Sequence, residues 1–272
     1  MAISAKTRLC AFVAHPAHHT ASPAMHNAGY KALDLDYVYL AFDVLDIGKA
    51  IEAMRTLNIA GYSVSLPHKV NVMQYLDEID PVAKKIGAVN TVVNTNGHLK
   101  GYNTDWVGCI EGIKEKTSIA GKNVLLIGAG GAARAIAFGI NEEGGSLFVL
   151  NRDIQKATAL VQETGGIAAS LDEIGDYLEK TDIIIQSTSV GMDPNTDATL
   201  VPPEKIKHTM VVNDIVYKPK TTKLLLDAQK AGATVVYGYK MLLLQGVRQF
   251  TLFTGSPAPT SAMEEALLTY LQ

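Results

Sequence analysis

An apolar segment followed at once by a glycine-rich loop is the feature that most restricts the fold of this chain. NVLLI (123–127) reads as a buried strand, and GAGGAARAIAFGI (128–140) continues with helical spacing. Gly128, Gly130 and Ala133 occupy the marked positions of the G-x-G-x-x-G/A pattern. In that pattern the glycines allow a tight turn and a close backbone approach to a pyrophosphate at a helix N-terminus. Because the required strand and helix flank the loop, it predicts a dinucleotide-binding domain rather than a plain turn.

Further apolar runs of strand length follow this loop. They are separated by helical or loop segments, and near-continuous apolar runs suit strands that are covered on both faces. The runs are SLFVLNR, DIIIQSTS, MVVNDIVY and ATVVYG. They predict a doubly wound Rossmann domain with a parallel sheet.

The first hundred residues also alternate between strand-like and helix-like segments. Strands are expected at 8–14, at 37–43 and in the run GYSV that begins at Gly61, and helices at 22–33 and 46–58. This β-α-β-α-β order predicts a largely parallel sheet with right-handed crossovers. Ser22 is expected to be the N-cap of the first helix, with Pro23 at its first helical position.

The end of the chain predicts two more helices, at 241–254 and 261–271, the second opened by Ser261 and Glu264 as a capping box. We therefore expect an α/β protein of two domains. Residues 1–106 plus 239–272 form an N-terminal substrate-binding catalytic domain with a parallel-rich sheet, and residues 107–238 form the Rossmann domain. The last helices return to the N-terminal domain. Two domains without a flexible linker predict a hinged cleft in which ligands bind.

Charge and composition exclude several classes of protein. The net charge of −3 and the pI near 6.2 argue against a nucleic-acid binder. No apolar run approaches the roughly 18 residues of a membrane span, and the N-terminus lacks the features of a signal peptide. Cys10 and Cys109 have no metal-ligand spacing and are expected to be core thiols. We expect a cytoplasmic protein with a small-molecule substrate, no nucleic-acid or membrane partner, and a monomeric or homodimeric state.

The residues after the second Rossmann strand bear on the choice between NAD and NADP. Arg152 and Lys156 are suited to a 2′-phosphate and favour NADP, whereas Asp153 is suited to a free 2′-hydroxyl and favours NAD. Arg152 can stack on adenine whichever cofactor is bound. We therefore expect NAD to be accepted, with NADP used as well.

Several longer motifs together resemble one known family. HPAHHTASPAMHN resembles G-x-P-x-x-H-S-x-S-P-x-x-H, and GYSVSLPHK resembles G-x-N-V-T-x-P-x-K. GAVNTVVN, GYNTDWVG, STSVGM, DIVYKPKTT and GYKMLLLQGVRQF match later signatures. Over essentially its whole length the chain resembles the shikimate dehydrogenase family, including the quinate/shikimate and shikimate-dehydrogenase-like branches.

The resemblance implies NAD(P)-dependent, reversible oxidation of shikimate or quinate to the 3-dehydro ketone. The context would be aromatic amino acid biosynthesis (the shikimate pathway) or quinate/shikimate metabolism. It also implies that Lys69 and Asp105 form the catalytic acid/base pair. Oxidising a carbinol releases its hydroxyl proton, so a base must contact that oxygen. A lysine takes this role at neutral pH only where burial or neighbours lower its pKa.

The resemblance assigns roles to other positions as well. The substrate-binding residues would be Thr20, Ser22, Ser65, Asn90, Tyr217 and Gln245. The cofactor-binding residues would be Gly128, Gly130, Gly131, Ala132, Asn151, Arg152, Asp153, Lys156, Thr188, Gly238 and Met241. No metal is expected, because the histidines near the N-terminus have no accompanying cysteine or carboxylate cluster.

The chain departs from the family pattern in the substrate segments. Ala14 replaces the first glycine, Ala17 an isoleucine-like residue and Thr20 a serine, while Ser63-Val64-Ser65 replaces N-V-T. Hydroxyls survive at Thr20 and Ser65, but the amide at position 63 is lost. Two alternatives remain: a non-catalytic regulator that binds dinucleotide or shikimate, and a dehydrogenase of a related cyclohexane carboxylate. A folate-type dehydrogenase is disfavoured by the hydroxyl-rich loop at residues 20–22.

Overall fold

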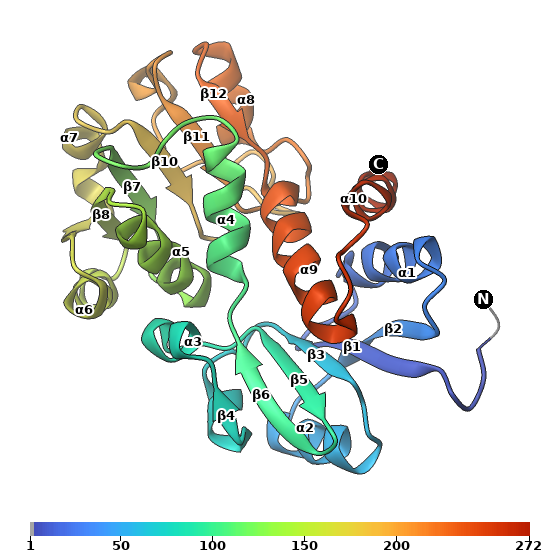
Figure 1. The fold of residues 1–272 in the computed structure, drawn as a ribbon. Helices are drawn as coiled ribbons and strands as arrows, with labels where there is room; N and C mark the ends of the chain where they lie inside the picture. The colour runs from blue at the N-terminus through green and yellow to red at the C-terminus, as the bar shows by residue number, and fades with distance from the viewer. Residues whose placement is uncertain (1–2) are drawn as a thin grey trace. The chain divides into compact units, whose positions relative to one another are not determined.

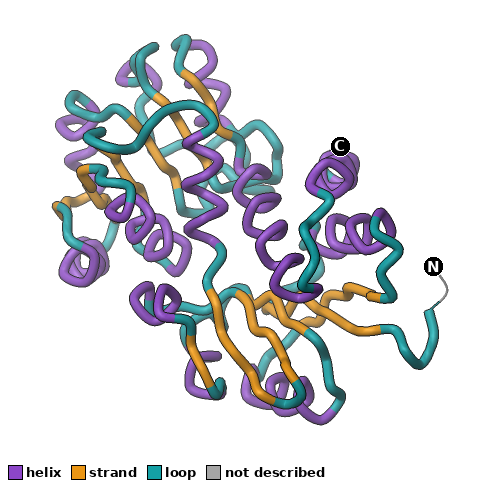
Figure 2. Tube along the Cα trace, viewed as in Figure 1, coloured by secondary structure: helices purple, strands orange, loops and turns teal. Residues whose placement is uncertain are grey.

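The computed structural model describes residues 3–272 and divides them into two compact units. Unit 1 is residues 3–104 with Gln245–Gln272, and unit 2 is Asp105–Leu244. Each unit contains one six-stranded sheet with helices beside it, as Figures 1 and 2 show. The expected α/β fold with two sheets is confirmed.

The sheet of unit 1 is mixed. Its order is β2-β1-β3-β5-β6-β4, in which β1 pairs in parallel with β2 and β3, and β4 pairs in parallel with β6. The pairs β3–β5 and β5–β6 are antiparallel. The strands are β1 (Arg8–Ala14), β2 (Tyr37–Asp43), β3 (Gly61–Val64), β4 (Glu78–Ile79), β5 (Thr91–Thr95) and β6 (His98–Tyr102).

The strands of the predicted β-α-β-α-β segment are parallel, because β1 pairs in parallel with β2 and β3, whereas the β5–β6 hairpin was not predicted and is antiparallel. Asn96 and Gly97 join these strands with φ of 53° and 91°. Two consecutive positive φ angles are typical of a type I′ turn, whose twist matches that of paired antiparallel strands. Asn-Gly is a strong hairpin signal in a sequence, so this turn was predictable.

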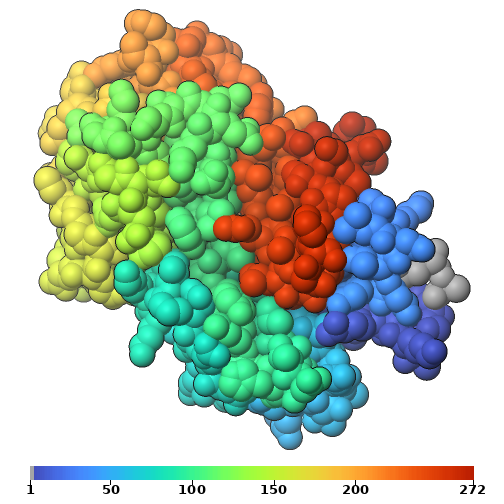
Figure 3. Space-filling view, in the orientation of Figure 1, coloured from blue at the N-terminus to red at the C-terminus, as the bar shows by residue number. Residues whose placement is uncertain are grey.

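The helices of unit 1 lie beside its sheet, and two of them bring the N-terminal and C-terminal parts of the chain into contact. In α2, Ile47, Ile51 and Met54 are buried, which confirms the predicted amphipathic face. Helix α10 packs against α1, and the space-filling view shows the C-terminal residues lying against the N-terminal ones (Figure 3). The helices are α1 (Ser22–Ala32), α2 (Ile47–Thr56), α3 (Pro81–Ile86), α10 (Thr260–Tyr270) and the 3₁₀ helix η1 (Asn71–Tyr75).

The sheet of unit 2 is parallel throughout, with the order β12-β11-β10-β7-β8-β9. Alternate residues of β7 enter two different cores: Val124 and Leu126 pack in one, Leu125 and Ile127 in the other. Successive strand residues point to opposite faces, so helices cover both faces of this sheet. The strands are β7 (Asn123–Ile127), β8 (Ser146–Asn151), β9 (Ile167–Ser170), β10 (Ile183–Gln186), β11 (Val211–Asp214) and β12 (Thr234–Val236).

The helices of unit 2 follow its strands in the doubly wound order. Helix α9 starts at Gly238, three residues before the predicted start, and its residues from Gln245 onward belong to unit 1. The helices are α4 (Asp105–Lys114), α5 (Gly131–Glu142), α6 (Ile154–Thr164), α7 (Ile174–Leu178), α8 (Lys223–Lys230), α9 (Gly238–Thr254) and the 3₁₀ helices η2 (Leu171–Glu173) and η3 (Pro203–Lys205).

Two predicted helix caps are wrong. The N-cap of α1 is Ala21, so Ser22 is the first helical residue, and its N–H donates to Thr20 Oγ1 at 3.2 Å. Because Thr20 supplies the acceptor from outside the helix, the helix begins one residue earlier than predicted, at Ser22 rather than at Pro23. Helix α10 has Pro259 as its N-cap and no side-chain cap, so Ser261 lies inside the helix and forms no capping box.

Both cysteines are free and buried, which confirms their assignment to the core. Burial raises the pKa of each thiol to about 12. Within residues 3–272 no helix is both long enough and apolar enough to cross a membrane. In the same part of the chain, no three His, Cys, Asp or Glu side chains gather as a metal site requires.

Candidate active site

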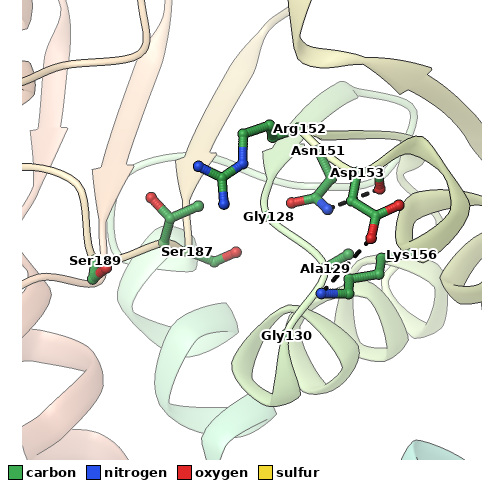
Figure 4. Close-up of a pocket in the computed structure, with 10 residues that line it drawn as sticks. Gly128, Ala129, Gly130, Asn151, Arg152, Asp153, Lys156, Ser187 and Ser189 are labelled. Carbon is green, nitrogen blue, oxygen red and sulfur yellow. Dashed lines mark hydrogen bonds and ion pairs between the residues drawn. The ribbon is translucent and has the colours of Figure 1, made fainter.

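A pocket of about 330 Å³ lies at the carboxyl ends of three adjacent strands of unit 2 (Figure 4). The loops after β7, β8 and β10 enclose it, and these strands are neighbours in the sheet. Ligands of open α/β sheets bind in this position, outside the carboxyl ends of the strands. Its lining residues are Gly128, Ala129, Gly130, Asn151, Arg152, Asp153, Lys156, Ser187, Thr188 and Ser189.

The glycine loop has the shape that a pyrophosphate requires. Gly128 has φ of +112°, and a Cβ there would lie 2.6 Å from Ser187 Oγ. A Cβ on Gly130 would meet no atom within 4 Å, so it would project into open space. Gly130 is also the N-cap of α5, whose first N–H groups have no partner inside the helix. The loop therefore fits a phosphate group held by backbone N–H groups at a helix N-terminus.

The charged residues after β8 divide into two groups. Asp153 is the N-cap of α6 and its Oδ1 accepts from Gln155 N at 3.1 Å, while Lys156 Nζ lies 3.7 Å from Asp153 Oδ2. In Figure 4 the Arg152 side chain points toward Ser187, on the other side of the pocket. The Asp153 carboxylate therefore has a structural use as the N-cap of α6.

The serines after β10 were not predicted as site residues. Ser187 and Ser189 line the pocket on either side of the predicted Thr188, and Ser187 Oγ donates to Ile127 O at 2.7 Å. Both serines follow β10, the neighbour of β7, and this position at the carboxyl end of a strand is the signal by which they could have been predicted as pocket residues.

Polar side chains of unit 1 form a buried cluster around Asn90. Asn90 Nδ2 donates to Thr104 Oγ1 at 3.0 Å, and Thr104 Oγ1 donates to Gln245 Oε1 at 3.5 Å. Two further predicted substrate residues, Thr20 and Ser22, are buried, and the Thr20 hydroxyl donates to Ser22 Oγ at 3.1 Å. The structure thus brings Asn90 and Gln245 together through Thr104, which was not among the predicted site residues.

A backbone hydrogen bond of unit 1 joins Lys69 to Val89, the residue before Asn90. Lys69 is half-buried, and its carbonyl accepts from the N–H of Val89, the residue before Asn90, at 2.8 Å. Ser65, also half-buried, follows β3, and its N–H donates to Val13 O at 3.0 Å. The first residue of α4, Asp105, is buried and belongs to unit 2.

The remaining predicted residues lie in unit 2. Tyr217 follows β11 and is half-buried, and Met241 packs in a core of this unit. Gly238 opens α9, and a Cβ there would overlap the carbonyl group of Val216. Glycine at this position allows the close packing of two backbone segments. Gly131 and Ala132 are the first two residues of α5.

Family models match most of the chain in three segments. The "Shikimate dehydrogenase substrate binding domain" matches residues 12–92, "Shikimate / quinate 5-dehydrogenase" matches 111–217, and "Shikimate 5'-dehydrogenase C-terminal domain" matches 238–268. The chain belongs to the shikimate dehydrogenase family. The resemblance inferred from the motifs is confirmed.

Individual members of the shikimate dehydrogenase family are similar over the full length. The shikimate dehydrogenase (NADP(+)) of Methanobrevibacter smithii is 46% identical, over 97% of this chain and 98% of the relative. A crystal structure of a shikimate dehydrogenase in complex with NADP+ has a TM-score of 0.96 and 38% identity, covering 100% of this chain and 98% of the other. The Listeria monocytogenes enzyme in complex with shikimate and NAD has a TM-score of 0.90 and 35% identity, covering 97% and 98%.

Proposed function

We propose that this chain is an NADP-dependent shikimate dehydrogenase that catalyses the reversible oxidation of shikimate to 3-dehydroshikimate. The observation that carries the proposal is the full-length identity of 46% to an enzyme named shikimate dehydrogenase (NADP(+)). The pocket of unit 2 supports it, because the glycine loop and the residues after β8 fit a dinucleotide. The reaction belongs to the shikimate pathway.

NADP is the preferred cofactor in this proposal, and NAD is the poorer one. Arg152 lines the pocket and offers its guanidinium to a 2′-phosphate. A guanidinium binds a phosphate through two parallel N–H donors. The Asp153 carboxylate is already engaged by a helix N–H and lies near the Lys156 ammonium, so its repulsion of a phosphate is reduced. When bound, the nicotinamide supplies the two-electron acceptor.

The residues of this chain have the task of holding shikimate and moving its proton. In the proposal, Lys69 in its neutral form accepts the proton of the hydroxyl that is oxidised, and Asp105 orients the same hydroxyl. Asn90 and Gln245 bind ring hydroxyls, with Ser65 and Tyr217 at the border of the site.

The shikimate carboxylate is bound by hydroxyl groups in this proposal. Thr20 and Ser22 donate to it, and Ser22 is the first residue of α1, where the helix dipole favours an anion. In the reverse direction Lys69 returns the proton to the forming hydroxyl.

Initial rates with shikimate and quinate, each with NADP and NAD, test the function. We expect the highest kcat/KM with shikimate and NADP. Purified, folded protein that reduces neither cofactor with either acid would contradict the proposal and favour a binding-only regulator. A clear preference for quinate would retain the reaction type but change the substrate.

A further inference from the structure

Position 63 is where the chain lacks an amide that the family pattern contains. Ser63 lies in β3 and is buried, with 4% of its surface exposed. Its hydroxyl donates to Gln249 Oε1 at 2.7 Å, across 186 residues of sequence. Gln249 comes from α9, so another element of unit 1 brings an amide group directly to the short side chain at position 63.

The amide of Gln249 makes its hydrogen bonds inside the protein. Its Nε2 donates to Asn90 O at 3.3 Å and to Thr91 Oγ1 at 3.0 Å. A carbonyl oxygen can only accept, so Asn90 O requires the nitrogen of Gln249 on its side and the oxygen toward Ser63. Gln249 is 1% exposed, and it therefore acts on a ligand only through its neighbours.

The orientation of Gln249 is passed on to the side chain of Asn90. Because Thr91 Oγ1 accepts from Gln249, its own proton is directed to Asn90 Oδ1, at 2.7 Å. With Oδ1 accepting, Nδ2 faces Thr104 Oγ1. The orientation of the Asn90 amide decides whether a ring hydroxyl meets an N–H donor or a C=O acceptor.

On the Ser63 side, this series of hydrogen bonds ends at Tyr39. Tyr39 OH donates to Ser63 Oγ at 2.6 Å, and the Tyr39 ring is stacked on His26 with centroids 4.3 Å apart. Burial raises the pKa of Tyr39 far above its usual range, although hydrogen bonding to Ser63 and to Ser22 opposes this. Tyr39 therefore keeps its proton and remains a donor, which leaves the Ser63 proton for Gln249.

We propose that Gln249 is a positioning residue for substrate binding, which supplies from α9 the amide group missing at Ser63 and, together with Thr104, sets the orientation of Asn90. The inference rests on the proposed function, in which Asn90 binds a ring hydroxyl of shikimate. It assigns the serine at position 63 and the glutamine at position 249 as one functional pair.

Four variants test the pair: Gln249→Ala, Gln249→Met, Ser63→Asn with Gln249→Ala, and the control Arg248→Ala. Gln249→Met keeps most of the volume but has no amide, so it separates lost hydrogen bonds from a cavity. Arg248 is the exposed neighbour on the same helix. Thermal unfolding establishes that each variant is folded, and KM and kcat are measured with shikimate and with NADP varied in turn.

We expect Gln249→Ala and Gln249→Met to raise the KM for shikimate about tenfold, the effect of losing one to two well-formed hydrogen bonds. The KM for NADP should not change. The double variant should recover most of the loss, because asparagine restores an amide opposite Thr91, whose hydroxyl donates to Asn90. Arg248→Ala should behave as the wild type.

Two results would overturn the inference. One is a folded Gln249→Met variant with the wild-type KM for shikimate. The other is a double variant no better than Gln249→Ala, which would make Gln249 a packing residue. If Gln249→Ala does not fold, the comparison is made with Gln249→Met and with Ser63→Asn/Gln249→Met. Failure of the proposed function is distinct, since the wild type itself would then not oxidise shikimate.

Discussion

Thr104 holds the side chain of Asn90 at both ends of its amide. Its backbone N donates to Asn90 Oδ1 at 2.9 Å, and its Oγ1 accepts from Asn90 Nδ2 at 3.0 Å. Both residues are buried, so water does not compete for these bonds. Thr104 also directly precedes Asp105 in the sequence. The residue that orients Asn90, a proposed substrate-binding residue, is therefore the neighbour of the proposed catalytic carboxylate.

Thr104→Val should weaken shikimate binding. Valine keeps the shape and the backbone donor but removes the acceptor for Asn90 Nδ2, so kcat/KM for shikimate should fall about tenfold. Thr251→Val is the matched control, because the Thr251 hydroxyl donates within α9 to Val247 O. Equal kcat/KM values for the two variants would remove Thr104 from the site.

Lys69→Ala should abolish most of the turnover while leaving dinucleotide binding intact. Loss of a general acid/base lowers kcat by roughly 10²-fold or more. The exposed Lys84→Ala serves as the control for loss of a lysine from the same unit. An undiminished kcat in Lys69→Ala would identify Lys69 as a surface charge.

Two glycines of the phosphate loop should respond differently to alanine. In Gly130→Ala the new methyl group enters the open pocket, so the KM for NADP should rise while the Tm stays at the wild-type value. Gly128→Ala should lower the Tm as well, because φ of +112° and the close Ser187 Oγ strain the loop. Kinetics and thermal unfolding of both variants check this, and an unchanged KM for NADP in Gly130→Ala would argue against phosphate binding here.

Arg152 and Asp153 should affect cofactor choice in opposite directions. Arg152→Ala removes the guanidinium that binds a 2′-phosphate, so kcat/KM should fall about tenfold or more with NADP and much less with NAD. Asp153→Thr keeps a good N-cap for α6 and removes a negative charge, so the ratio should shift toward NADP. The ratio of kcat/KM for the two cofactors is the measurement. If neither substitution moves it, both residues are loop charges only.

Asp214 should make the stability of unit 2 fall as the pH rises from 4 to 6. Burial raises the pKa of its carboxyl from 3.8 to about 6, although Thr222 Oγ1 donates to Asp214 Oδ2 at 2.6 Å. Below pH 4 the carboxyl is protonated in both the native and the unfolded state, and between pH 4 and pH 6 it is protonated only in the native state. Native stability is therefore lost through this window and is level above it.

Asp214→Asn removes this ionisation while keeping a side chain of the same shape. Its free energy of unfolding relative to the wild type should increase by on the order of 2–3 kcal/mol between pH 4 and pH 7. Denaturant unfolding at several pH values measures the difference. Parallel pH profiles for the two proteins would show that Asp214 does not titrate in this range.

Local patterns in the sequence were enough to predict the elements that carry a clear periodicity or motif. The strands Arg8–Ala14, Tyr37–Asp43 and Asn123–Ile127 have the predicted bounds, and the glycine loop lies between a strand and a helix as expected. Such elements depend on side-chain alternation and on backbone conformations that nearby residues determine. Motifs of the same kind were sufficient to recognise the family.

Features that depend on competition between nearby groups were predicted less well. The start of α1 moved because Thr20 supplies an acceptor outside the helix, and Asp153 has a use as the N-cap of α6. The Asn96-Gly97 turn adds an antiparallel hairpin beside the predicted parallel strands, and β5 also pairs antiparallel with β3, so the sheet is mixed. In each case the residue type indicated a possible structural role, but the hydrogen-bonding partner in the folded protein decided which role the residue has.

The sequence by itself determined the fold class, the glycine loop and the family of this protein, whereas the tertiary structure decided the relationships inside the site. From the sequence, Ser63 is only a departure from a family pattern, and nothing connects it with Gln249. The structure places the two side chains 2.7 Å apart across 186 residues. A hydrogen bond of this kind depends on how β3 and α9 pack, and packing is set by the whole core rather than by neighbouring residues.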